Sequence, residues 1–143
     1  MKSDPLASLL RLRRLTADQA RRELADCLRA ESEARQAIAA IDAAIARETE
    51  VATGLAGGDA EVEAFAAWLR RVRPNQHGAR VAEAATVAQT TEARAVLAMA
   101  RAAVRAVEEL LTQRAAEERI IAEHHAQREI DEVAQRTERH AIR

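Results

Sequence analysis

The 143-residue chain is long enough for one domain, but it contains one Phe, one Trp and no Tyr, so the large side chains that usually dominate a globular core are missing. Charged residues make up 31% of the chain, 48% is apolar with Ala supplying much of it, and there are four Gly and two Pro, a composition typical of long helices. The formal net charge of −1 argues against nucleic-acid binding by bulk electrostatics, since such domains are usually strongly basic.

The first predicted element is a long helix over about residues 5–55. Heptads read from Leu6 place apolar residues at most of the positions that would face a partner helix, a pattern that defines a coiled-coil seam. The exceptions are Arg13, Glu31 and Glu48. These charges either set the alignment of the helices by penalising shifted pairings, or are simply solvated at a narrow seam. The predicted apolar seam residues are Leu6, Leu10, Ala17, Ala20, Leu24, Cys27, Ala34, Ile38, Ile41, Ile45, Ala52 and Leu55.

A glycine-rich stretch is expected to end this helix, because glycine adopts turn conformations at low cost. Gly54, Gly57 and Gly58 precede Asp59, which is a good N-cap residue. A short helix over about 60–72 follows. The segment 73–78, which contains Pro74, is expected to form a second break.

The third predicted element is a long helix over about 79–140, which contains no Pro or Gly. Its apolar stripe repeats at spacings of three and four, and its distal part is more polar, so that part is expected to fray or to wait for a partner. Two long helices with a compact connection can bury their stripes by folding back. The predicted fold is therefore all-α, a single domain over 1–143 that forms a long antiparallel two-helix coiled-coil hairpin, with the short helix near the tip and both termini at the other end. The stripe residues are Ala93, Leu97, Ala100, Val104, Val107 and Leu111.

No enzyme signature is present. Lys2 is the only lysine, so a phosphate-binding loop that ends in Gly-Lys-Ser/Thr is impossible. His124 and His125 lie among glutamates, but no His has a Glu three residues before it, as a di-iron bundle requires, and adjacent side chains point to different sides of a helix. Cys27, the only cysteine, is interpreted as a small buried apolar residue. We therefore expect no catalytic residue, no metal and no cofactor.

The segment 61–72 contains both aromatic residues. Val62, Phe65, Leu69 and Val72 recur at helical spacing with Trp68 beside them. This face either caps the hairpin tip or stays exposed as an anchor for a partner. No segment approaches the ~20 apolar residues needed to cross a bilayer, so a cytoplasmic protein without direct membrane insertion is expected.

Three segments resemble the FliJ family of flagellar type III export stalks. They are the opening Asp4-Pro5-Leu6-Ala7-Ser8-Leu9-Leu10-Arg11-Leu12-Arg13, the central aromatic segment, and the closing Ile130-Asp131-Glu132-Val133-Ala134-Gln135-Arg136. The resemblance covers essentially the whole chain. The chain departs from many members of the family in its richness in Ala, its near absence of Lys and its few aromatic residues.

The resemblance implies a non-enzymatic stalk that promotes assembly and activity of the hexameric export ATPase. It also implies links to the export gate membrane protein and to export chaperones, and a cytoplasmic location at the membrane-bound apparatus. Carried over by position, the gate side comprises Phe65, Trp68, Leu69 and Val72. The ATPase side comprises Arg13, Arg14, Arg21, Arg22, Asp131, Glu132, Gln135 and Arg136. The alternative is a coiled-coil adaptor of another bacterial assembly, such as the injectisome counterpart of the stalk.

Overall fold

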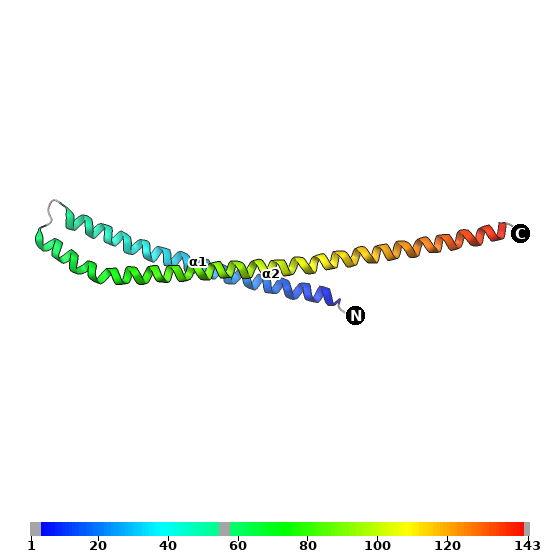
Figure 1. Ribbon diagram of the computed structural model, residues 1–143, viewed down its shortest axis with the longest axis horizontal. Coiled ribbons are helices and arrows are strands. Elements are labelled where there is room, and N and C mark those ends of the chain that lie inside the picture. The colour runs from blue at the N-terminus through cyan, green and yellow to red at the C-terminus, as the bar shows by residue number, and fades with distance from the viewer. Residues whose placement is uncertain (1–3, 55–57, 142–143) are drawn as a thin grey trace. The chain divides into compact units, whose positions relative to one another are not determined.

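A computed structural model describes residues 4–54 and 58–141, with side chains described as far as Thr137. The described chain forms two long helices that pack against each other, α1 (Pro5–Thr53) and α2 (Asp59–Ala141) (Figure 1). Leu55 and Gly57, which the sequence placed in the seam and in the first break, lie outside the described residues.

The chain divides into two compact units, and each helix contributes to both. Unit 2 is Thr16–Ala100, and unit 1 combines Met1–Leu15 with Arg101–Arg143. The expectation of a single domain stays a prediction.

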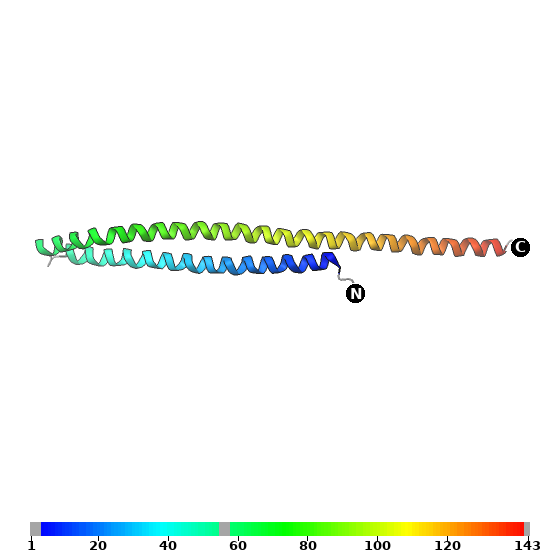
Figure 2. The ribbon, with the colours of Figure 1, turned by 90° about the horizontal axis from the view of Figure 1, so that it is seen from below.

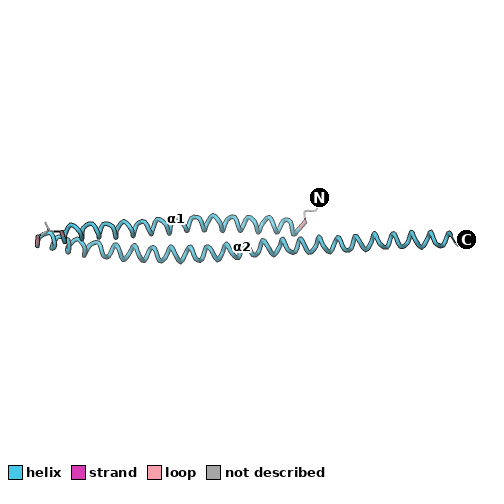
Figure 3. The backbone as a smooth tube through the Cα atoms, turned by 90° about the horizontal axis from the view of Figure 1, so that it is seen from above, coloured by secondary structure: helices cyan, strands magenta, loops and turns pink. Residues whose placement is uncertain are grey.

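In unit 2 the contacts between the helices run in opposite sequence order along α1 and α2. The Asp42 carboxylate accepts a hydrogen bond from the Gln76 side-chain amide at 2.5 Å and lies 3.9 Å from the Arg80 guanidinium. Seven residues earlier on α1, Arg35 lies 3.6 Å from Glu83, which is seven residues after Gln76. The two helices lie side by side through this unit in both views (Figures 2 and 3).

The predicted heptad face of α1 is the face that packs. Every seam position described from Leu6 to Ala52 is buried or half-buried except Arg13 and Glu48. The predicted α2 stripe is likewise buried or half-buried throughout, with Leu97 and Val107 each 5% exposed. The core is a narrow strip, because many of its side chains are alanines that bring little surface out of water.

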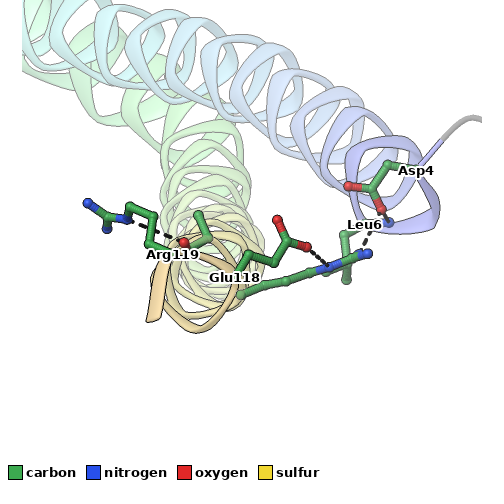
Figure 4. A network of polar contacts seen from close by, with 6 residues as sticks. Asp4, Leu6, Glu118 and Arg119 are labelled. Carbon is green, nitrogen blue, oxygen red and sulfur yellow. Dashed lines mark hydrogen bonds and ion pairs between the residues drawn. The ribbon is translucent and has the colours of Figure 1, made fainter. Parts of the chain in front are cut away.

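Unit 1 repeats the reversed order of contacts. Arg14 donates to Glu108 at 2.9 Å, and Arg114 Nη1 donates to Asp4 Oδ1 at 3.2 Å (Figure 4). Beyond Arg114, α2 continues to Ala141, and every side chain from Glu117 to Thr137 is exposed. The expectation that the two termini of the chain lie together at one end is therefore wrong. α2 has 83 residues and α1 has 49, so the start of α1 meets α2 well before α2 ends.

The predicted second break and the separate short helix over 60–72 are also wrong, because α2 runs without interruption through Pro74 and Gly78. Proline removes only the backbone hydrogen bond from its own nitrogen, to the carbonyl four residues earlier, and its ring bends the helix. α2 curves in this region, shown in green in Figure 1. Gln76 and Arg80, just after the proline, both contact Asp42 on α1, so packing against α1 favours a continuous helix there.

Both helices begin with a local cap. Asp4 Oδ1 accepts a hydrogen bond from the Leu6 amide at 3.1 Å, the geometry of an N-cap carboxylate (Figure 4). At α2 the capping position belongs to Gly58 and not to the predicted Asp59. The Gly58 carbonyl accepts bonds from Glu61 and Val62, and its own amide donates to Glu61 Oε2 at 2.8 Å. The Glu61 side chain thus supplies half of a capping box.

Within the described residues, neither helix combines the length and apolar character that a membrane span requires.

Candidate partner-binding surfaces

The aromatic residues lie near the start of α2. Phe65 and Trp68 are both half-buried, with ring centroids 6.0 Å apart and ring planes at 30°. They are three residues apart, so they occupy neighbouring rows of the helix surface.

On one side of the pair lies a groove that we call the basic groove. It has a volume of about 520 Å³. Apolar side chains from both helices share its lining with two guanidiniums and one imidazole, and its Arg80 also lies 3.9 Å from Asp42. The lining residues are Ile45, Thr49, Phe65, Leu69, Arg73, Gln76, His77 and Arg80.

A second, smaller hollow of about 320 Å³ uses Phe65 again but opens beside Trp68; we call it the Trp68 groove. Its charged groups are the carboxylates of Glu48 and Glu61, and none of the described residues that line it is a cation. The two grooves therefore offer opposite charge next to a shared aromatic ring. The remaining lining residues are Val51, Ala52 and Ala64.

The structure divides the predicted gate-side residues between these grooves. Phe65 lines both, Leu69 lines the basic groove and Trp68 lines the other. Val72 is half-buried and lines neither of them.

Sequence reasoning missed the polar wall of the basic groove. Arg73, Gln76 and His77 were assigned to a break in the helix, which hid their relation to Phe65 and Leu69. On a continuous helix Phe65, Leu69, Arg73, Gln76 and Arg80 follow one another at spacings of three and four, and so share a face. That spacing is present in the sequence and could have identified the groove if the proline had been read as a bend.

The predicted ATPase-side arginines fall in both units. Arg13 and Arg14 belong to unit 1, whereas Arg21 and Arg22 belong to unit 2. All four are exposed; Arg14 pairs with Glu108 at 2.9 Å, and Arg21 lies 3.8 Å from Asp18 in its own helix. Exposed pairs of this kind contribute little to stability and leave the guanidiniums accessible to a partner.

The C-terminal residues of the predicted ATPase side lie on the exposed part of α2. Asp131 accepts a hydrogen bond from Gln127 at 3.0 Å, and Arg136 lies 3.8 Å from Glu132. Gln135 is exposed. Arg14 meets Glu108, 23 residues before Asp131, which corresponds to about 35 Å along the helix. Within unit 1 the structure therefore does not bring Arg13 and Arg14 together with 131–136.

We call residues 117–137 of α2 the terminal segment. Its large apolar side chains are between 54% and 63% exposed. They do not form one stripe, because Ile120 and Ile121 are about 100° apart around the helix and Ile130 lies two and a half turns after Ile121, on the opposite side. A helix with isoleucines on several sides can be contacted from several directions at once. The apolar residues are Ile120, Ile121, Ile130 and Val133.

The start of α1 is fastened to α2 by a small polar network in unit 1. Arg114 donates from Nη1 to Asp4 and from Nε to Glu118, both at 3.2 Å (Figure 4). One turn further on, Arg119 Nε donates to the Ala115 carbonyl at 3.3 Å. The network includes Glu118 and Arg119, the second and third residues of the terminal segment.

Among the residues that the structure describes, no group of three or more His, Cys, Asp or Glu side chains could hold a metal ion. His124 and His125 lie on the exposed terminal segment beside Ile120, Ile121 and Arg128. Cys27 is a half-buried free thiol in the seam.

Comparison with protein-family models, with curated proteins and with solved structures finds no match to this chain. The resemblance to the FliJ family accordingly stays a hypothesis that rests on the three sequence segments given above.

Proposed function

We propose that this chain is a non-enzymatic stalk of the flagellar type III export apparatus, in which an antiparallel two-helix coiled coil links the hexameric export ATPase to the export gate and to export chaperones. The antiparallel coiled coil is supported by the heptads of α1 and by the reversed order of contacts in each unit.

The observation that carries the proposal is the terminal segment. All of its described side chains are exposed, and its isoleucines lie on several sides of the helix. Its apolar surface therefore stays in contact with water unless a partner covers it. A ring of subunits would cover such a helix from all directions. The family resemblance assigns this end of the chain to the ATPase.

A stalk needs a second surface for its second partner, and unit 2 carries the two grooves beside Phe65. Aromatic side chains in a concave setting are frequent anchors of protein interfaces. The resemblance assigns this region to the gate. We therefore infer that the terminal segment serves the ATPase and that the grooves serve the gate.

The test uses the full-length chain with the export ATPase and the cytoplasmic part of the gate protein from the same genome. Rates of ATP hydrolysis and the fraction of hexamer are measured with and without the chain, and gate binding is measured by calorimetry. We expect stimulation of hydrolysis and formation of a complex with the gate fragment.

A variant that ends at Glu118 is the matched control. It should lose stimulation of the ATPase and retain gate binding, because it lacks nearly all of the terminal segment but keeps both grooves. If the full chain neither stimulates the flagellar ATPase nor binds the gate, the proposal is wrong. Stimulation of an injectisome ATPase instead would establish the alternative adaptor function.

A further inference from the structure

Two polar residues are buried in the seam of unit 2. Glu31 is 7% exposed and Thr90 is 1% exposed, and they are the buried polar residues of the described chain. The hydroxyl oxygen of Thr90 has no hydrogen-bond partner among the residues that the structure describes. A buried hydroxyl without a partner, and a carboxylate taken largely out of water, both disfavour folding. Neither residue is explained by its contribution to stability.

The charge of Glu31 is compensated from the edge of the seam. Arg35, one turn later on α1, forms an ion pair with Glu31 at 2.5 Å and lies 3.6 Å from Glu83 on α2. The Arg35 side chain is 60% exposed, so it stays in contact with solvent while it neutralises a carboxylate that is 10% exposed. Two carboxylates and one guanidinium thus meet beside the seam.

From the contacts between the helices we infer that Thr90 lies opposite Glu31. Asp42 is level with the stretch 76–80 of α2. Glu31 lies eleven residues before Asp42, and in a pair with reversed order it is level with 87–91, where Thr90 is the buried residue. By the same reasoning Cys27 is level with 91–95, where Ala93 is the half-buried residue.

Most other layers of this seam discriminate weakly between alignments. Small side chains such as Ala17, Ala20, Ala34, Ala79 and Ala93 make similar contacts after the helices slide by one heptad. A seam rich in alanine therefore needs another element to select one alignment.

The connection between the helices does not supply that selection by itself. Thr53, eleven residues after Asp42, is level with the stretch 65–69, whereas α2 begins at Asp59. α2 thus starts well beyond the end of α1. A slide of one heptad would bring Thr53 level with 58–62, so the same connection could join the helices in the shifted pairing.

We propose that the Glu31–Thr90 layer fixes the alignment of α1 on α2 by penalising this slide. In the shifted pairing Glu31 would face Glu83, and the two carboxylates would repel each other at the edge of the seam. A slide of one heptad in the other direction would set the Glu31 carboxylate against Leu97, which is 5% exposed. In the observed alignment Glu31 is level with the uncharged Thr90 and has the Arg35 guanidinium beside it. The inference does not depend on the proposed function.

Cys27, the only cysteine of the chain, provides a direct test of the alignment. Ala93→Cys reports the observed pairing, and Thr86→Cys, one heptad earlier, reports the slide. Each variant is oxidised at low concentration, and the intramolecular disulfide is quantified by mass spectrometry. In the otherwise native chain we expect the disulfide of the Ala93→Cys variant to form about tenfold or more faster than that of the Thr86→Cys variant.

A second experiment removes the proposed constraint by replacing both residues with leucine, in the double variant Glu31→Leu with Thr90→Leu. By the same alignment, Leu24 and Leu97 form such a leucine pair one heptad away. We expect a melting temperature higher by roughly 4 °C or more, because buried polar groups are replaced by packed apolar ones. We also expect disulfide formation in the Thr86→Cys background to rise about tenfold.

Glu48→Leu is the matched control, since Glu48 occupies a predicted seam position but is exposed, and it should leave both disulfide rates unchanged. Glu31→Gln removes the repulsion and retains polarity, so it should raise the rate in the Thr86→Cys background even if the leucine pair folds poorly. The inference is overturned if both reporters react equally in the native chain, or if neither replacement of Glu31 raises the rate of the shifted reporter.

Discussion

The Asp4 carboxylate lies 3.2 Å from the Arg114 guanidinium and also accepts a hydrogen bond from the Leu6 amide, so one side chain both caps α1 and fastens it to α2. Asp4 and Arg114 are 42% and 52% exposed, which limits the ion pair to a few tenths of a kcal/mol. The cap is the larger contribution, about 1 kcal/mol.

Asp4→Ala should therefore destabilise the start of α1 by about 1 kcal/mol, and Asp4→Asn, which keeps a capping oxygen, by only a fraction of that. Hydrogen exchange of the amides in the first turn measures the difference. Equal acceleration in the two variants would show that the ion pair, and not the cap, holds this end.

Leu97→Ala should lower the free energy of unfolding by about 2–3 kcal/mol, because Leu97 is 5% exposed in a seam that has few large side chains. Leu110→Ala, at a leucine that is 49% exposed on the same helix, is the control and should cost less than about 1 kcal/mol. Urea denaturation followed by circular dichroism compares them. Similar losses would mean that Leu97 is not in the packed face.

Gly78→Ala should stabilise the protein by about 0.5–1 kcal/mol, because Gly78 is inside α2 and a Cβ added there meets nothing within 4 Å. At Gly54 a Cβ would approach the Glu50 carbonyl oxygen at 3.3 Å, so Gly54→Ala should bring no comparable gain. Thermal melts provide the comparison. Destabilisation by Gly78→Ala would show that the chain turns at Gly78 in solution.

Trp68 is the only tryptophan, so its fluorescence reports directly on the Trp68 groove. If the gate fragment covers the groove, the emission maximum should move to shorter wavelength on titration, because the half-buried indole loses its remaining water. Phe65→Ala should weaken this response by removing the ring that lines both grooves. An unchanged spectrum in a complex proven by calorimetry would locate the contact in the basic groove or elsewhere.

Removal of the residues after Glu118 should change the melting temperature by less than roughly 2 °C, since every described side chain from Glu117 to Thr137 is exposed and contributes little packing. The helical signal should fall in proportion to the residues removed. A much lower melting temperature would show that the terminal segment folds back onto the helix pair.

The heptads of α1 and the stripe of α2 identified the packed faces from sequence alone. A repeat of apolar residues selects one side of a helix wherever that helix is placed, so the burial of residues such as Ala20, Ile41 and Leu97 could be predicted without knowledge of their neighbours. The aromatic segment was also recognised as a candidate surface, although its division between two grooves was not.

Only the tertiary structure showed which of the charged seam positions are buried and how far each helix extends. Glu31 is buried whereas Arg13 and Glu48 are exposed, although the heptad treats the three alike. Pro74 and Gly78 predicted a break, yet α2 continues through them. Gln76 donates a hydrogen bond to Asp42 on α1, and Arg80 lies 3.9 Å from the same carboxylate. Burial and helix continuity at such positions depend on which side chains of the opposite helix lie at the same level. A pattern read along one helix does not show which side chains those are.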